Sequence, residues 1–223
     1  LRLERRDDQL AVGDRRVRRP GAVVAVRGFV RFLLARGVLP HGFAGNKKTR
    51  KEVQHARAAY YASVSFIDSQ VGVIVKALEE LNLFRNTVIV FVSDHGFLLG
   101  EHGGVVDKKL LYEGVARVPL IIAGPGVPEA RVSPRIVELV DIFPPLSELC
   151  GLPAREGLEG VSFTPLFQDP NRAWKSAAFT QTIKSKKSPL YHSVRTERYA
   201  YFEQENGTEP ELYDHVNDPH EVT

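Results

Sequence analysis

The chain has no methionine and only one cysteine among its 223 residues. Because position 1 is leucine, we expect that the chain does not begin at a native start codon. A single cysteine excludes a disulfide within the chain and leaves the redox compartment open. No apolar run reaches the length of a membrane-spanning helix and no signal peptide is visible, so we expect no membrane span. Cys150 ends an apolar stretch, and we expect a buried, structural thiol there.

Negative charge is scarce in the first forty residues, where most of the excess positive charge gathers. The segment 1–41 is rich in arginine, alanine, valine and glycine, which is typical of a GC-rich gene read in the wrong frame. We therefore expect a segment that is non-native or disordered, although residues 23–38 could form a short helix. A nucleic-acid-binding arm is the alternative interpretation. Aromatic residues that could stack on bases are nearly missing there, so we expect no nucleic-acid partner.

An apolar run ends abruptly in polar residues near the middle of the chain. Residues 87–92 are β-prone and predict a buried strand, which is followed by Ser93-Asp94-His95-Gly96. A carboxylate and an imidazole at the carboxyl end of a strand lie where open α/β sheets bind ligands. Together they can ligate a divalent cation. The alternative is an aspartate that caps a turn beside a surface histidine.

The segment after this strand is rich in glycine and ionisable residues. It contains Gly100-Glu101-His102-Gly103-Gly104 and then Asp107-Lys108-Lys109. A second apolar run follows at residues 118–123. A loop of this composition between two strands indicates a site rather than a spacer.

These motifs, in this order, resemble the C-terminal half of a type I sulfatase, a formylglycine-dependent enzyme of the alkaline phosphatase superfamily. The resemblance runs from about residue 42 to residue 221 and is greatest to iduronate-2-sulfatase-like enzymes. It rests on Ser93-Asp94-His95-Gly96, Leu99-Gly100-Glu101-His102-Gly103, Lys108, Leu111-Tyr112-Glu113, Arg117-Val118-Pro119-Leu120-Ile121, Val140-Asp141-Ile142-Phe143-Pro144 and Glu211-Leu212-Tyr213-Asp214.

The resemblance implies a fold, an activity and a set of site residues. The fold is α/β: the C-terminal part of an alkaline-phosphatase-like sandwich with a mainly parallel sheet, plus a small antiparallel sheet. The activity is hydrolysis of a sulfate ester on a sulfated carbohydrate. Asp94 and His95 are expected to bind Ca²⁺ or another divalent cation, and Lys108 to act on the sulfate as a catalytic and substrate-binding residue. Lys109 is the competing choice for that role.

Two further residues of the loop have open or structural interpretations. His102 either touches the substrate at the rim of the pocket or is a loop residue bonded to a backbone carbonyl. Glu101 is expected to accept hydrogen bonds from backbone amides of its own loop. Glu113 and Arg117 are expected to form an ion pair.

The motif that supplies the family's nucleophile is missing. Relatives carry Cys-x-Pro-x-Arg, whose cysteine becomes formylglycine, together with an acidic pair after their first strand. Here Cys150 precedes Gly151-Leu152 rather than Pro-x-Arg. We therefore expect formylglycine to belong to an N-terminal half that this sequence lacks, and the chain as given to be inactive. Val106 also departs from the family, in which an aromatic residue is common.

The sequence divides into three parts: the arginine-rich segment 1–41, a partial catalytic domain at 42–150, and a linker with a truncated antiparallel subdomain at 151–223. Helices are expected at 52–83 and 137–150, and strands at 87–93, 118–123, 176–183, 190–196 and 198–204. The helix at 52–83 should bury one face, formed by Val64, Ile67, Val71, Val75 and Leu78.

Two other functions remain open. A phosphoesterase or phosphonate hydrolase of the same superfamily would share the Asp-His strand end. A non-catalytic binder of polyanions or nucleic acid would rest on the basic N-terminus. The sequence does not indicate a localisation, although members of the family are often periplasmic, secreted or lysosomal.

Overall fold

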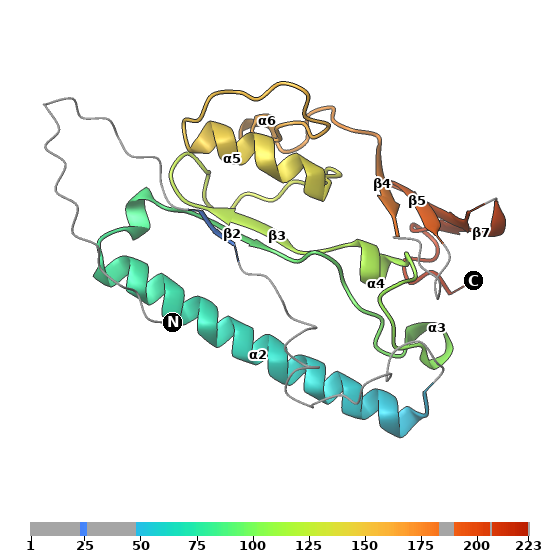
Figure 1. The fold of residues 1–223 in the computed structure, drawn as a ribbon. Coiled ribbons are helices and arrows are strands. Elements are labelled where there is room, and N and C mark those ends of the chain that lie inside the picture. The colour runs from blue at the N-terminus through green and yellow to red at the C-terminus, as the bar shows by residue number, and fades with distance from the viewer. Residues whose placement is uncertain (1–22, 26–47, 183–189, 206, 223) are drawn as a thin grey trace, which may run out of the picture.

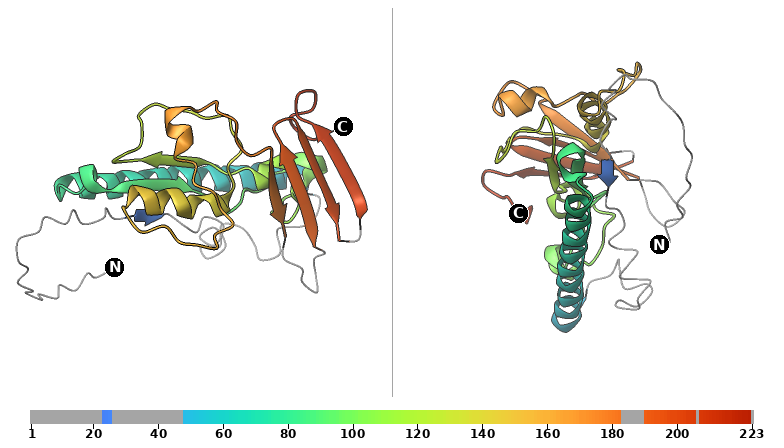
Figure 2. Two further views of the ribbon diagram at one scale, coloured as in Figure 1. Left: turned by 90° about the horizontal axis from the view of Figure 1, so that it is seen from above. Right: turned by 90° about the vertical axis from the view of Figure 1, so that its left-hand side faces the viewer.

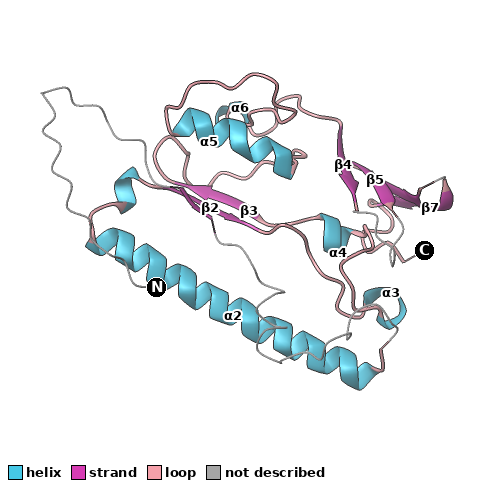
Figure 3. Cartoon of the chain, viewed as in Figure 1, coloured by secondary structure: helices cyan, strands magenta, loops and turns pink. Residues whose placement is uncertain are grey.

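The computed structural model describes residues 23–25, 48–182, 190–205 and 207–222. Two sheets and several helices make up these residues (Figures 1 and 3). In chain order the elements are β1 (Val23–Ala25), α2 (Arg50–Glu80), η1 (Phe84–Asn86), β2 (Val88–Val92), α3 (Glu101–Gly104), α4 (Glu113–Ala116), β3 (Leu120–Ala123), η2 (Leu139–Ile142), α5 (Phe143–Leu149), α6 (Pro165–Gln168), β4 (Ala177–Gln181), β5 (Tyr191–Thr196), β6 (Tyr199–Gln204) and β7 (Thr208–Asp214).

The first sheet lies between helices. Its strand order is β1-β2-β3, with β2 parallel to β1 and antiparallel to β3. The long helix α2 runs along one side of the sheet, and α5 and α6 lie on the other side (Figure 1). Val88 and Val90 of the central strand lie on one face and are buried, whereas Ile89 on the other face is half-buried. The predicted α/β fold is confirmed, with strand β3 as an antiparallel addition.

Helix α2 begins and ends where its sequence provides caps. Thr49 accepts a hydrogen bond from the backbone of Glu52, whose carboxylate accepts one in return from the Thr49 backbone. The chain leaves the helix through Asn82, which adopts a left-handed conformation with φ 55°. The helix therefore starts two residues before the predicted start and ends three residues before the predicted end.

The predicted apolar face of α2 is only partly covered. Leu78 is buried, whereas Val64 is 47% exposed. The other three predicted positions, Ile67, Val71 and Val75, are half-buried. Within the described part of the chain, α2 is also the one helix long and apolar enough to cross a membrane, with 6% of its most apolar stretch buried. Because the core helix of a soluble protein meets the same criteria, the prediction of no membrane span is not tested.

The predicted helix at 137–150 is shorter than expected. Residues 139–142 form a turn of 3₁₀ helix, and the α-helix α5 begins only at Phe143. Pro144 and Pro145 occupy its first turn, where their missing N–H groups are not needed. Cys150 caps the end of α5 and is half-buried, so the expectation of a fully buried thiol is wrong.

The second sheet is antiparallel, with the strand order β4-β5-β6-β7 (Figure 2). Three of its strands and the tight turn between β5 and β6 match the prediction. The edge strand β7 was not predicted, because its sequence carries Pro210 and three acidic residues, which are uncommon in strands. Pro210 is tolerated there because an edge strand leaves one row of N–H groups unpaired.

Little of the N-terminal segment belongs to the described residues. Its described part, Val23–Ala25, is a strand, so the helix predicted at 23–38 is wrong at its start. The remaining predictions for residues 1–41 lie outside the described residues.

Candidate functional site

The Asp-His pair lies at the end of β2, as the sequence predicts. Ser93 turns the chain by donating from its hydroxyl to the His95 carbonyl over 2.8 Å. The Gly96 amide donates to the Val115 carbonyl over 2.7 Å, which joins the start of the loop to its end. A Cβ on Gly96 would lie 2.0 Å from the Gly114 carbonyl oxygen, so only glycine allows this approach.

His95 is held in one orientation by its neighbours. Its Nδ1 lies 2.8 Å from the Gly96 carbonyl oxygen, which can only accept, so Nδ1 carries the proton. The other nitrogen, Nε2, therefore presents its lone pair. This arrangement is typical of histidines that bind metals, since a carbonyl commonly fixes the tautomer.

The ammonium group of Lys108 lies next to the lone pair of His95 Nε2. Its Nζ lies 3.1 Å from His95 Nε2, and the Asp94 carboxylate lies 3.8 Å from the same nitrogen. The structure thus brings together three residues that the sequence singled out, although Lys108 is thirteen positions away from His95. The contact favours Lys108 over Lys109 for the role in the site.

The side chains of Asp94 and Lys108 are exposed, whereas His95 is half-buried. One carboxylate oxygen and one imidazole nitrogen therefore converge from adjacent residues, with an ammonium beside them. Two donors satisfy part of the shell of a divalent cation, because Ca²⁺ takes six to eight oxygen ligands. The donor set therefore supplies only a minor part of a cation site.

His102 lies against an aromatic ring. Its imidazole stacks on Tyr112 with ring centroids 3.7 Å apart and planes 12° apart. Its backbone is left-handed, with φ 55° and ψ 51°, so α3 is an irregular turn rather than a regular helix. Tyr112 donates in turn to Glu211 of β7 over 3.1 Å and packs edge-on against Phe202. His102 is thus linked through Tyr112 to the C-terminal sheet.

Both structural expectations for neighbouring acids are confirmed. Glu101 accepts a hydrogen bond from the Leu99 amide of its own loop and pairs with Arg57 of α2 at 3.3 Å. Glu113 pairs with Arg117 at 3.2 Å. Val106, the departure from the family, is fully buried and fills the core beneath the loop.

A second cluster of charged residues was missed by the sequence analysis. Glu113, His215 and Glu221 place their ligand atoms within 4.8 Å of one another. Glu221 is buried and accepts from His215 Nε2 over 2.9 Å and from the Glu113 amide over 2.6 Å. Arg195 donates to Glu113 over 3.3 Å and to His215 Nδ1 over 2.8 Å. The guanidinium balances the carboxylates, so the cluster forms a closed ion network that joins α4 to the C-terminal sheet.

The sequence motifs do not mark Arg195 or His215 as site residues. Up to 108 positions separate the partners, and no local motif marks them. Only a comparison of substitutions that change together could have found the network.

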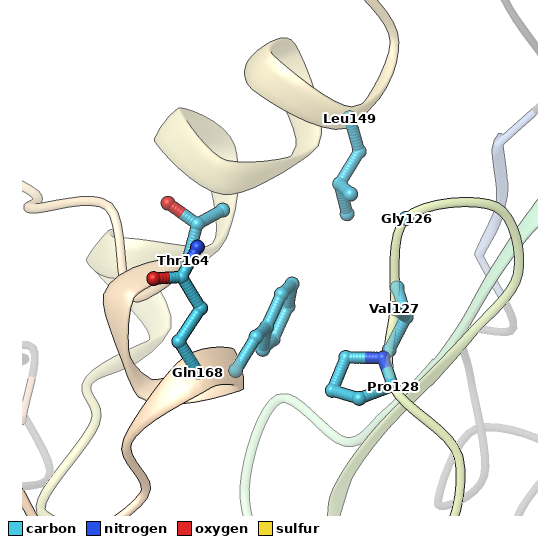
Figure 4. A pocket seen from close by; sticks show the side chains of 7 residues that line it. Gly126, Val127, Pro128, Leu149, Thr164 and Gln168 are labelled. Carbon is cyan, nitrogen blue, oxygen red and sulfur yellow. The ribbon is translucent and has the colours of Figure 1, made fainter.

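A pocket of about 450 Å³ lies elsewhere, between α5, α6 and the loop after β3 (Figure 4). Leu149 and Thr164 line one side of it, and Val127 and Pro128 line the other. The residues around Asp94 do not line this pocket. At the candidate site, the side chains of Asp94 and Lys108 are exposed at the end of β2 and in the loop that follows it.

Comparison with known proteins identifies the family. The sulfatase profile matches residues 37–152, and the profile described as "N-sulphoglucosamine sulphohydrolase, C-terminal" matches residues 100–223. Arylsulfatase K of Canis lupus familiaris is 32% identical over 189 residues, which is 79% of this chain and 35% of that protein.

Two solved structures are similar in fold. A protein in complex with its substrate D-glucosamine-2-N,6-O-disulfate aligns with a TM-score of 0.71 and 28% identity over 86% of this chain and 40% of that one. The phosphonate monoester hydrolase of Agrobacterium radiobacter aligns with a TM-score of 0.70 and 30% identity over 78% of this chain and 38% of that one.

The chain spans well under half the length of these relatives. The narrower likeness to iduronate-2-sulfatases stays a prediction. The sulfatase profile alone covers more than half of the residues and includes both the long helix and the loop after β2. The chain belongs to the type I sulfatase family of the alkaline phosphatase superfamily.

Proposed function

We propose that the chain forms part of a sulfatase that cleaves a sulfate ester of a carbohydrate, and that the loop after β2 supplies its metal-binding and sulfate-binding side chains. The observation that carries the proposal is the contact of Lys108 Nζ with His95 Nε2 at 3.1 Å, beside the Asp94 carboxylate. A carboxylate, an oriented imidazole and an ammonium at one strand end are the groups that binding a cation and an anionic ester requires.

Asp94 and His95 would hold the divalent cation, and Ca²⁺ is the candidate. The carboxylate is the hard ligand that Ca²⁺ prefers, and His95 is the weaker ligand because imidazole suits softer metals. A bound cation would neutralise charge on the sulfate. The hydrogen bond of His95 to the Gly96 carbonyl keeps Nε2 available as a ligand atom.

Lys108 would stabilise the negative charge that develops on the sulfate or on the leaving oxygen. Its side chain is exposed and its position beside His95 is set by one contact, so the ammonium is free to turn toward an anion. His102 would act at the rim of the site, where its stacking on Tyr112 fixes the ring.

Formylglycine, when present, supplies the nucleophile that attacks sulfur. The 223 residues contain no Cys-x-Pro-x-Arg motif from which it could form. The chain by itself should therefore show no sustained hydrolysis of an aryl sulfate or of a sulfated disaccharide. Sustained turnover that depends on Asp94 would contradict this.

The chain alone should bind Ca²⁺ weakly, because two ligands leave most of the shell to water. We expect a dissociation constant in the range of about 10⁻⁴–10⁻³ M, which is typical of weak calcium sites. Calorimetry should detect this binding, and Asp94→Asn should abolish it. The matched control Asp169→Asn changes an exposed aspartate outside the site and should leave it intact. Micromolar binding, or equal loss in both variants, would argue against the assignment.

Residue roles can be ranked in a chimera in which a relative's N-terminal half carries the formylglycine motif. Asp94→Ala should cost more activity than Lys108→Ala, since the cation governs the charge balance of the whole site. Lys108→Ala should lower kcat by about 10²–10³, as loss of one anion-stabilising donor does. His102→Ala should mainly raise KM. Near-normal kcat for Asp94→Ala would overturn the metal assignment.

A phosphonate monoester hydrolase is the second candidate, because one similar structure is named as such. Assaying the chimera with matched aryl sulfate and aryl phosphonate esters separates the two. A sulfatase should prefer the sulfate by kcat/KM. A preference for the phosphonate would favour the second candidate and leave the roles of Asp94 and Lys108 in place.

A further inference from the structure

A second hollow, with a volume of about 590 Å³, lies beside the C-terminal sheet. Three segments far apart in the sequence line it: the loop before η2 with Arg135, the segment 173–176 that enters β4, and the β5–β6 turn at 196–199. Its volume is in the range of small-molecule binding sites. The residues proposed for sulfate ester cleavage do not line it.

Two buried N–H groups at this hollow lack a hydrogen-bond partner among the described residues. They are Nε of Arg135 and Nε1 of Trp174. The guanidinium is otherwise fixed, since its terminal nitrogens donate to the Glu197 carboxylate and to the Asn171 carbonyl. Buried donors of this kind nearly always have an acceptor. Two such donors at one hollow therefore indicate an acceptor that is not among the described residues, and a bound ligand would supply one.

The charges around the hollow are already paired. Lys175 lies between the Glu138 and Asp141 carboxylates, with a distance of 2.7 Å to each. Arg198 pairs with Asp214 at 2.7 Å, and Arg135 pairs with Glu197 at 2.5 Å. Because each cation of the lining has a carboxylate partner, the hollow does not attract an anion strongly. The orphaned donors favour neutral oxygen acceptors instead.

The lining also offers aromatic surface. Tyr199 is 41% exposed, and the Arg198 guanidinium carbon lies 4.9 Å from the centre of its ring. Trp174 is half-buried between the turn and the loop. The outer wall consists of exposed residues of the β5–β6 turn. Because the two donor atoms are buried, a ligand ring would reach them by displacing these exposed side chains. An amphipathic ligand with an apolar ring face and oxygen acceptors fits these walls.

We propose that this hollow binds one neutral sugar ring of an oligosaccharide. Its oxygens would accept hydrogen bonds from Trp174 Nε1 and Arg135 Nε, while its apolar face would lie on the Tyr199 ring. The site is separate from the loop after β2 and does not rest on the proposed function. It would hold a glycan at the surface whether or not the chain takes part in sulfate ester cleavage.

The chain has a built-in reporter for this site, because Trp174 is its only tryptophan. The purified chain is titrated with N-acetyllactosamine, with its 6-sulfated form and with inorganic sulfate, while tryptophan fluorescence is recorded. We expect a saturable change with both sugars, with affinities within about twofold of each other, and no change with inorganic sulfate. If neither sugar acts, or if inorganic sulfate competes with the sulfated sugar, the proposal is wrong.

Variants test which groups hold the ligand. Arg135→Lys keeps the charge but removes the Nε–H donor and should weaken binding about three- to tenfold, the effect of one hydrogen bond. Tyr199→Ala removes the exposed ring and should weaken binding to a similar degree. Phe179→Ala is the matched control, because Phe179 is an exposed aromatic residue on β4 that does not line the hollow.

Trp174→Phe keeps an aromatic ring but removes the indole N–H together with the five-membered ring, and it removes the fluorescent reporter, so its binding is followed by calorimetry. We expect the same three- to tenfold loss. Thermal melting identifies any variant that fails to fold, and Tyr199→Ala then decides the outcome because it removes an exposed ring at the start of β6. Unaltered affinity in Arg135→Lys and Tyr199→Ala, or an equal loss in Phe179→Ala, would overturn the proposal.

Discussion

Asp141 is the residue whose replacement tests the structure most directly. Its side chain is fully buried and accepts three hydrogen bonds from three different segments. The backbone amides of Glu138 and Val161 donate over 3.0 and 2.8 Å, and the Lys175 ammonium donates over 2.7 Å. The carboxylate therefore holds together the η2 turn, the linker before α6 and the entry to β4.

The variant Asp141→Asn keeps the size of the side chain and exchanges one oxygen for an NH₂ group. One amide oxygen cannot serve donors on both sides, so at least one buried N–H group loses its acceptor at a cost of about 1–3 kcal/mol. The bond to Lys175 also changes from charged to neutral, which costs about 1 kcal/mol more. We expect the free energy of unfolding to fall by about 2–4 kcal/mol.

Urea denaturation followed by circular dichroism measures this loss. The matched control Asp169→Asn makes the same chemical change at an exposed position and should stay within about 0.5 kcal/mol of the parent. Adding Lys175→Met to Asp141→Asn should cost less than the sum of the single changes, because the two residues are partners. A loss below 0.5 kcal/mol in Asp141→Asn would refute the reasoning.

Three other changes have defined outcomes. Tyr112→Phe should lower the free energy of unfolding by about 0.5–1.5 kcal/mol at pH 7, through loss of the hydrogen bond to Glu211. Burial, and then the charge of Glu211, raise the pKa of Tyr112 to about 12. The stability that the Tyr112 hydroxyl contributes is therefore complete below pH 10 and is lost as the pH rises toward 12. Denaturation curves that show a constant difference between Tyr112→Phe and the parent across that range would contradict this. Hydrogen bonding by Arg198 lowers the pKa of Asp214 to about 2, so the deficit in melting temperature of Asp214→Asn should be present above about pH 4 and should vanish as the pH falls to 2. Thr49→Ala should cost about 1 kcal/mol in urea denaturation by removing the cap of α2, and Thr49→Ser should restore most of it.

The elements that the sequence predicted well are those with strong local patterns. Strand β2 is a continuous apolar run, and α2 carries both a capping box and a left-handed asparagine at its end. The sequence patterns gave wrong predictions where contacts between distant segments determine the structure. Val64 lies at helical spacing from buried positions but is exposed. Pro210 argues against a strand in the sequence, yet β7 forms because it pairs with β6.

The candidate site was predictable to the extent that its residues are close in the sequence. Asp94 and His95 are adjacent, and Lys108 follows in the same loop, so a motif could carry all three. The network around Glu113 was not predictable, because Arg195 and Glu221 reach it from 82 and 108 positions away. Hydrogen bonds across such separations follow from folding, and a single sequence gives no sign of them.

The backbone contact at the base of the loop after β2 separates the strand register from the conformation of the loop. Val92 pairs with Leu120, so the chain leaves the sheet and returns to it at the same point. Just beyond, the amide of Gly96 donates to the Val115 carbonyl of α4, and a Cβ on Gly96 would clash with Gly114. Insertions at exposed positions beyond this contact would leave the strand register unchanged. They would have to keep the buried Val106 and the contact of Lys108 with His95, and Gly96 would have to stay a glycine.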